Sequence, residues 1–154
     1  MNYLEALGIV HAALEPAFYV EIGCRNGESL ELAPCPRVGI DPEAAITVDL
    51  TRPTRIFRET SDAFFARPDV ADVLGGPYDL AFIDGMHLAE FALRDFVNLE
   101  AHAAPHAVIL VDDVAPGDIA WATRTRETKA WTGDVYRMLA VLARYRPDLE
   151  IAVF

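Results

Sequence analysis

The sequence predicts one α/β domain: a Rossmann-like, doubly wound, mostly parallel sheet with helices on both faces. Short, mostly apolar strand-like runs alternate with segments of helical periodicity, and two of those runs are followed by acidic residues. Apolar runs without alternating polarity are typical of buried parallel strands. The length of 154 residues suits a single core, so we expect one domain spanning residues 1–154.

The expected elements follow one another closely. Six short strands are expected between turn residues, at Ala17–Ile22, Arg37–Asp41, Thr54–Arg58, Tyr78–Ile83, Ala107–Val111 and Leu149–Phe154. Helices are expected at residues 2–14, after a tight turn at 23–27, after a cap at Ser61 or Asp62, at 88–103 and around 135–142. Residues 41–54 are too few and too rich in proline for a full helix, and 114–131 form a long polar loop.

Charge and composition exclude several classes of function. A net charge of −11, with 13 Lys and Arg against 24 Asp and Glu, argues against nucleic-acid and anionic-membrane surfaces, which are basic. The N-terminus lacks a signal-peptide pattern and no run approaches the roughly 18 apolar residues of a membrane span, so we expect a cytoplasmic location. Cys24 and Cys35 show no Cys-x-x-Cys spacing and are expected as reduced, partly buried thiols.

Acidic residues follow two strands at the point where each ends. Asp84 follows the run 78–83, and Asp112 and Asp113 follow the run 107–111. Because parallel strands end at the same edge of a sheet, these carboxylates should converge there and repel one another without a positive charge. Carboxylate oxygens suit Mg²⁺, Mn²⁺ or Ca²⁺, so the pattern predicts a divalent-cation site. The alternative is structural: the acids would then stabilise the turns that follow the two strands.

Two glycines mark the turn after the first strand. Gly23 and Gly27 lie four residues apart in Glu21-Ile22-Gly23-Cys24-Arg25-Asn26-Gly27, where missing side chains let a ligand approach the backbone. The spacing does not match Gly-x-Gly-x-x-Gly, so NAD is disfavoured. Asp41 ends the second strand 14 residues after Gly27, where doubly wound folds place an acid that binds ribose hydroxyls. The turn therefore predicts a nucleoside site.

With this turn and spaced acid, the sequence resembles the class I S-adenosylmethionine-dependent methyltransferases. Their signature is an acidic-x-Gly-x-x-x-Gly turn and an acid after strand two, matched here by Glu21, Gly23, Gly27 and Asp41. Later segments resemble the small-molecule O-methyltransferases of the cephalosporin-pathway and macrolide-sugar type, methyltransferase family 24. They are Tyr19–Gly23, Phe82–His87, Val111–Asp113 and Trp131–Val135.

The resemblance implies a cofactor, a metal and a reaction. The cofactor would be S-adenosylmethionine and the acceptor a small-molecule hydroxyl. Asp84, Asp112 and Asp113 stand where metal-dependent members hold Mg²⁺, and His87 stands three residues past Asp84, where the catechol enzymes carry their base. The metal would lower the pKa of the acceptor hydroxyl and His87 would take its proton.

Further cofactor contacts are implied less directly. The segment after strand three touches the adenine in the family, which points to Ser61 and Asp62, although both residues are equally well explained as helix caps. Asp84 is also expected to contribute to cofactor binding. Trp121 and Trp131 either line the acceptor pocket or pack in the core.

The sequence also departs from the family pattern. The family fold carries a seventh strand, antiparallel between strands five and six, which is absent from this sequence. The resulting open edge predicts a homodimer or higher oligomer. A second hypothesis therefore stays open, in which the chain binds S-adenosylmethionine or its product without catalysis, or serves only in assembly. A receiver domain is excluded because its paired acids follow the first strand.

Overall fold

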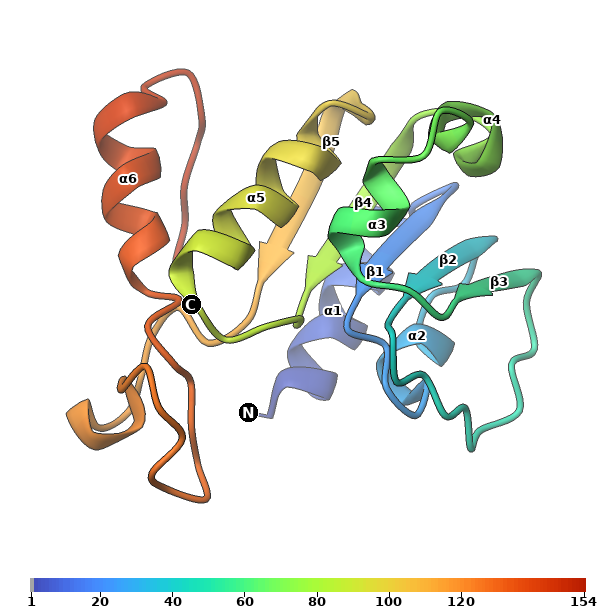
Figure 1. The fold of residues 1–154 in the computed structure, drawn as a ribbon. Helices are drawn as coiled ribbons and strands as arrows, with labels where there is room; N and C mark the ends of the chain where they lie inside the picture. Colours follow the sequence, from blue (N-terminus) through green and yellow to red (C-terminus); the bar gives the residue numbers. More distant parts are fainter. Residues whose placement is uncertain (1) are drawn as a thin grey trace.

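Five parallel strands form one sheet in the order β3-β2-β1-β4-β5, with helices against both faces (Figure 1). The structure is a computed structural model that describes residues 2–154. In chain order the elements are α1 Tyr3–Leu14, β1 Tyr19–Ile22, α2 Glu28–Glu31, β2 Arg37–Ile40, β3 Thr54–Phe57, α3 Ser61–Phe65, α4 Val70–Leu74, β4 Tyr78–Ile83, α5 Ala89–Glu100, β5 Ala103–Val111, the 3₁₀ helix η1 Ile119–Trp121 and α6 Arg137–Tyr145. The predicted fold class is confirmed.

The two faces of the sheet bury two separate hydrophobic cores. Successive strand residues point to opposite faces, so Leu80 and Phe82 of β4 belong to the core under α1 and α2. Ala81 and Ile83 belong to the larger core under α3, α5 and α6. Both free cysteines are buried on the α1 and α2 side, in agreement with the predicted thiols.

Strand β5 is longer than the sequence predicts. It begins at Ala103 rather than Ala107, because the pairing with β4 shifts register between Tyr78 and Leu80 and resumes on the far side of the irregularity. Pro105 and exposed His106 lie in this added portion and hide it from a search for apolar runs. The carboxyl end at Val111, which positions the acids, is where the sequence predicts it.

The predicted sixth strand is wrong. Residues 149–154 have no strand structure, although they run in the same direction as β5 in Figure 1, and Ile151, Val153 and Phe154 are exposed. In the family pattern, the place next to β5 belongs to the seventh strand. Residues 149–154 therefore have no neighbouring strand with which to pair among the described residues, and apolar composition alone does not make a strand without a partner.

The start of α3 also differs from the expectation. Thr60, not Ser61 or Asp62, is the N-cap, and its hydroxyl accepts a hydrogen bond from the Ala63 N–H at 3.2 Å. A threonine in extended conformation is as good a cap as the serine that follows it, so the sequence could not choose between them. The short helix α4, which ends at left-handed Gly75, was not predicted.

Surface features bear on possible partners. Strands β3 and β5 are the edges of the described sheet, and the pairing of the β5 edge with a second copy stays a prediction. Among residues 2–154, no helix has both the length and the apolarity that crossing a bilayer requires.

A buried polar network joins α1, β1 and α2. The Tyr19 hydroxyl donates to Glu21 Oε2 at 2.8 Å, and the Ser29 hydroxyl donates to Glu21 Oε1 at 2.5 Å. Burial raises the pKa of the Glu21 carboxyl to about 7. His11 packs edge-on against Tyr19, at 4.7 Å between centroids, with both ring nitrogens buried and without a hydrogen-bond partner among residues 2–154. Burial lowers the pKa of His11 to about 4.

This depressed pKa predicts a pH dependence of stability. The unfolded chain binds a proton at His11 near pH 6.5 and the folded chain only near pH 4, so stability that is complete above pH 6.5 is lost as the pH falls to 4. His11→Phe keeps the edge contact and has no proton to bind. The free energy of unfolding of this variant should therefore fall by roughly 2 kcal/mol less than that of the wild type as the pH is lowered to 4. Chemical denaturation from pH 4 to 8 measures it, with exposed His106→Gln as control. An unchanged pH profile in His11→Phe would contradict the assignment.

Candidate active site

The carboxyl edge of the sheet brings the predicted acids together. The Asp84 N–H donates to the Ile22 carbonyl at 2.9 Å, and the Asp112 N–H donates to the Ile83 carbonyl at 3.0 Å. These bonds continue the parallel ladder one residue past each strand, so the two acids leave the sheet side by side. Asp113 follows in the left-handed region, with φ of 61°, which turns the chain away from the strand direction.

Asp84, His87 and Asp113 form the tightest group of possible ligands. One ligand atom of each lies within 4.8 Å of the others. His87 Nε2 is 3.8 Å from Asp84 Oδ1, and His87 Nδ1 is 2.6 Å from Asp113 Oδ2, an ion-pair distance without hydrogen-bond geometry. Asp112 lies outside this group but lines the same pocket, together with Val111, Val135 and the turn 84–87. The structure thus places all four predicted residues at one site, with His87 nearer to Asp113 than the spacing to Asp84 implied.

The carboxylates of this site perturb one another. Burial and then the Asp112 charge raise the pKa of Asp84 to about 7, and burial and Asp113 raise the pKa of Asp112. The adjacent Asp113 carboxylate raises the pKa of His87. Repulsion between buried carboxylates is relieved by a cation between them, so the electrostatics of the site favour a positive ligand.

Trp131 stacks on the His87 ring. The two rings stack at 5.1 Å between centroids and 9° between planes. The Trp131 Nε1–H donates to the Thr123 carbonyl at 2.6 Å, which fixes the indole within its loop. Gly133, with φ of 60°, lies so close that an added Cβ would stand 1.6 Å from the His87 carbonyl oxygen. The pairing of Trp131 with His87 therefore depends on a glycine two residues later.

A fully buried carboxylate anchors the same loop. Asp134 Oδ1 accepts from the Ala89 N–H, the first residue of α5, at 2.9 Å, and its Oδ2 accepts from Arg124 at 2.8 Å. Arg124 also donates to both carboxylate oxygens of Glu90. Leu88, the N-cap residue of α5, offers no side-chain acceptor, so Asp134 supplies the cap from a distance in sequence.

The glycine turn packs directly against the acidic site. An added Cβ at Gly23, with φ of 90°, would lie 1.9 Å from the Asp84 carbonyl oxygen. Gly27, with φ of 87°, is the N-cap residue of α2, and an added Cβ there would press against Ile46 and Val48. Gly23 is thus required by the protein's own backbone, which accounts for the glycine independently of a ligand.

Asp41 and Glu21 have structural partners where the sequence predicts cofactor contacts. Asp41 Oδ2 accepts from the Arg25 N–H and its Oδ1 from the Glu43 N–H, both at 2.7 Å, so Asp41 ties the glycine turn to the end of β2. Each oxygen keeps a further lone pair for a ligand. Glu21 is fully buried and bonded to Tyr19 and Ser29, so it supports the turn from beneath.

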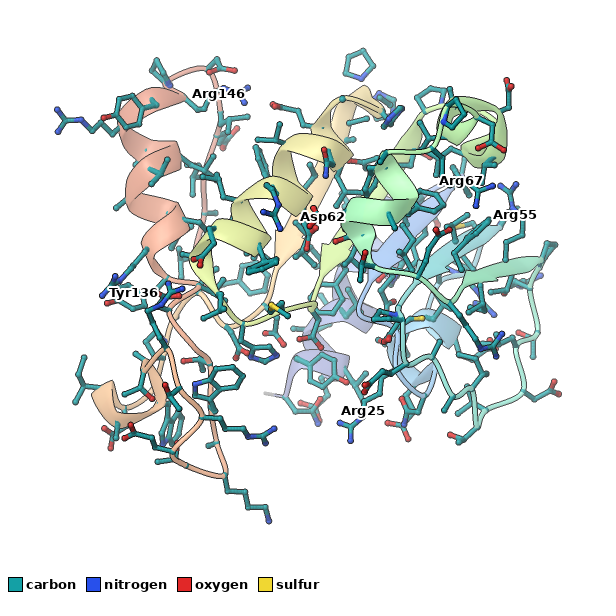
Figure 2. The ribbon with its side chains drawn as sticks, viewed as in Figure 1. Arg25, Arg55, Asp62, Arg67, Tyr136 and Arg146 are labelled. Carbon is teal, nitrogen blue, oxygen red and sulfur yellow. The ribbon has the colours of Figure 1, made fainter. Side chains whose placement is uncertain are left out.

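Asp62 and Ser61 lie apart from the glycine turn. Figure 2 shows Asp62 between α3 and α5, well separated from Arg25 of the turn. Asp62 pairs with Arg94 of α5 at 2.6 Å, half-exposed. The Ser61 hydroxyl lies by Asp95, a buried carboxyl of α5 whose pKa burial raises to about 6. The adenine contacts of Ser61 and Asp62 stay predictions.

Three residues near the site have no role in the sequence prediction. Tyr3 stacks on Phe82 beside the acids, Asp95 lies under Gly85, and Asp134 caps α5. The segment Trp131-Thr132-Gly133-Asp134-Val135 was a usable signal for Asp134, because an acid inside an otherwise apolar and aromatic segment needs a partner. Tyr3 carries no such signal, since an aromatic residue at the start of a helix is ordinary.

Comparison with known proteins identifies the family. A family model described as a methyltransferase domain matches residues 20–114, which extend from β1 to just past the acidic pair. The chain belongs to this methyltransferase family. Its match contains the glycine turn, Asp41, Asp84 and both acids after β5. None of the curated proteins compared with this methyltransferase matches it.

Solved structures confirm the methyltransferase fold. The O-methyltransferase TomG from Streptomyces achromogenes, involved in tomaymycin synthesis and solved with S-adenosylmethionine, is 20% identical with a TM-score of 0.62, and the match covers 92% of this chain and 67% of TomG. An O-methyltransferase from Bacillus cereus, solved with S-adenosylhomocysteine, is 15% identical with a TM-score of 0.62, covering 93% and 69%.

The contact between Gly133 and His87 makes a prediction for this methyltransferase. Gly133→Ala should destabilise the protein by roughly 2–4 kcal/mol and separate Trp131 from His87, because the methyl group has no space and φ is positive. Thermal unfolding and tryptophan fluorescence measure both effects. Gly8→Ala is the matched control: nothing lies within 4 Å of its Cβ in α1, so it should stabilise by about 0.5–1 kcal/mol. Equal stability of the two variants would contradict the packing described here.

Proposed function

We propose that this methyltransferase transfers the methyl group of S-adenosylmethionine to a hydroxyl oxygen of a small molecule, assisted by a divalent cation. The observation that carries the proposal is the convergence of Asp84, Asp112, Asp113 and His87 in one pocket directly against the glycine turn. The family and the two O-methyltransferase structures support the reaction class. The alternative, a domain that binds the cofactor without catalysis, leaves this pocket unexplained.

The residues present fit S-adenosylmethionine. The turn at Gly23 and Gly27 and the Asp41 carboxylate form one hydrogen-bonded unit at the carboxyl edge, where doubly wound folds bind nucleosides. The sulfonium carries a positive charge, which would be favoured beside Asp84 and Asp112, two carboxyls whose pKa values are raised. Because Gly23 touches the Asp84 backbone, a ligand on the turn ends beside the acids. S-adenosylmethionine supplies an electrophilic methyl group when bound.

The donor set also fits a hard divalent cation. Asp84, Asp112 and Asp113 would hold it through carboxylate oxygens, which suit Mg²⁺. A bound Mg²⁺ lowers the pKa of a coordinated hydroxyl. Burial and the neighbouring carboxylates raise the pKa values of Asp84 and Asp112 although His87 lies 3.8 Å from Asp84, so a further cation would be favoured among these carboxylates.

His87 would accept the proton of the acceptor hydroxyl. Asp113 lies at Nδ1 and Trp131 stacks on the ring, so the imidazole is held in one orientation with Nε2 directed toward Asp84. An imidazole titrates near neutral pH and is suited to this transfer. The pocket walls, Val111, Val135 and Ala92, are apolar and limit water around the reacting oxygen.

Metal binding and proton transfer can be separated by substitution. Asp84→Asn and Asp112→Asn should weaken Mg²⁺ binding by roughly 10- to 100-fold in calorimetric titration, because each removes a charged donor. His87→Gln should leave Mg²⁺ affinity as in the wild type and slow the formation of S-adenosylhomocysteine by about 10²–10⁴-fold with a panel of phenols and sugars. The control is exposed Asp72→Asn in α4. Loss of Mg²⁺ binding in His87→Gln would make His87 a ligand instead of the base.

The cofactor site has its own matched control. Asp41→Ala should weaken S-adenosylmethionine binding by roughly 10-fold or more, since it removes the ribose acceptor and frees the Arg25 N–H. Asp79→Ala is comparable in structure: Asp79 Oδ2 accepts from the Ala17 and Phe18 N–H groups at 2.9 and 3.0 Å, at the opposite edge of the sheet. Calorimetry of both separates the effects. Equal loss in both variants would mean that Asp41 acts only through folding, and a wild type that binds no S-adenosylmethionine would overturn the proposed function.

A further inference from the structure

Tyr3 occupies a position at the carboxyl edge that the proposed chemistry leaves without a role. It is the first residue of α1, whose start lies at the edge toward which the strand arrows point in Figure 1. Its ring stacks on Phe82 at 6.3 Å between centroids and 17° between planes. Asn2 and Glu5 form a capping box, with bonds of 2.9 and 3.0 Å, that fixes the start of the helix. Tyr3 remains 43% exposed, so one part of the side chain is open to a ligand.

The side chain beneath Tyr3 connects the two halves of the candidate active site. Phe82 is paired in register with Glu21 of β1, and Asp84 follows two residues later on the same face of the sheet. Gly23 likewise follows Glu21 on that face and touches the Asp84 backbone. A ring stacked on Phe82 therefore lies next to the junction of the glycine turn and the acidic pocket.

The charges around Tyr3 have one sign. After burial, four carboxylates raise the pKa of its phenol, and they come from four different elements of the site: Asp84, Glu21, Asp112 and Glu28. Glu28 begins the helix after the glycine turn, and Asp84 and Asp112 directly follow β4 and β5. The phenol is thus within the electrostatic influence of both parts of the proposed site, the one that would hold the nucleoside and the one that would hold the acceptor.

We propose that Tyr3 contacts the sulfonium end of S-adenosylmethionine and distinguishes the charged cofactor from its neutral product. The inference rests on the proposed function, because it assumes that this ligand binds at the glycine turn. An aromatic ring attracts a cation through its electron-rich face, and the surrounding acids strengthen that attraction. In the reaction, the acceptor oxygen bonds to the methyl carbon, the C–S bond breaks and its electron pair stays on sulfur. The sulfur is then neutral and the attraction to Tyr3 is lost, which favours release of S-adenosylhomocysteine.

Calorimetric titration with S-adenosylmethionine and with S-adenosylhomocysteine tests the proposal. Tyr3→Leu keeps apolar volume over Phe82 and removes the ring, so it should weaken S-adenosylmethionine binding roughly 2- to 30-fold and leave S-adenosylhomocysteine binding nearly unchanged. Tyr3→Phe keeps the ring and should retain the wild-type ratio of the two affinities. Tyr145→Leu, at an exposed tyrosine of α6, is the control.

The outcomes are distinct. An equal loss for both ligands in Tyr3→Leu overturns the proposal and leaves Tyr3 a packing residue, and unchanged affinities place it outside the site. If Tyr3→Phe also changes the ratio of the two affinities, the effect belongs to the hydroxyl, and the proposed contact with the ring face is contradicted. Thermal unfolding of each variant establishes that it is folded. A wild type that binds neither ligand refutes the proposed function, a result that cannot be confused with the preceding three.

Discussion

The contact between Gly23 and the Asp84 carbonyl determines how the rest of the site is arranged. Two parallel strands, β1 and β4, end side by side, and the turn after one passes so close to the end of the other that only glycine fits. The turn is held on its other side by Asp41, which binds the Arg25 N–H. The proposed nucleoside site and the acidic pocket thus adjoin because of backbone packing between the two turns.

The same contact keeps the acidic residues of the site close to one another. Burial and the Asp112 charge raise the pKa of Asp84, and burial and the Asp113 charge raise the pKa of Asp112. The backbone contact with Gly23 keeps the end of β4 from relaxing away. The protein therefore stores electrostatic repulsion at the position where a cation would bind, in the manner of sites that are organised before their ligand arrives.

The sequence was most informative where a strand ends. Tyr78–Ile83 and the carboxyl end of β5 were predicted at their observed residues, because apolar runs and the acids after them report burial directly. The sixth strand failed because strand formation at 149–154 depends on a neighbour that the run itself cannot reveal. Thr60 and Ser61 can both cap a helix through a hydroxyl, so the sequence could not show which of them is the N-cap of α3.

Contacts between distant segments were beyond prediction for a similar reason. The stacking of Trp131 on His87 and the cap that Asp134 supplies to Ala89 join residues more than 40 positions apart. No periodicity records such pairs. Asp79 and Asp41 illustrate the point from the other side, since each accepts two backbone N–H groups at opposite edges of the sheet. An acid beside a strand is thus compatible with a purely architectural role.

The anchoring of Gly133 and Asp134 has a consequence for motion. The C-terminal root of the 114–134 loop is immobilised, because Asp134 is fully buried under the start of α5 and Gly133 presses on the His87 backbone. In the proposed function, an opening that admitted an acceptor would therefore hinge near the tip of the loop, before Trp131. Displacement of the root would also displace the imidazole, so access to the pocket and the orientation of His87 would be coupled.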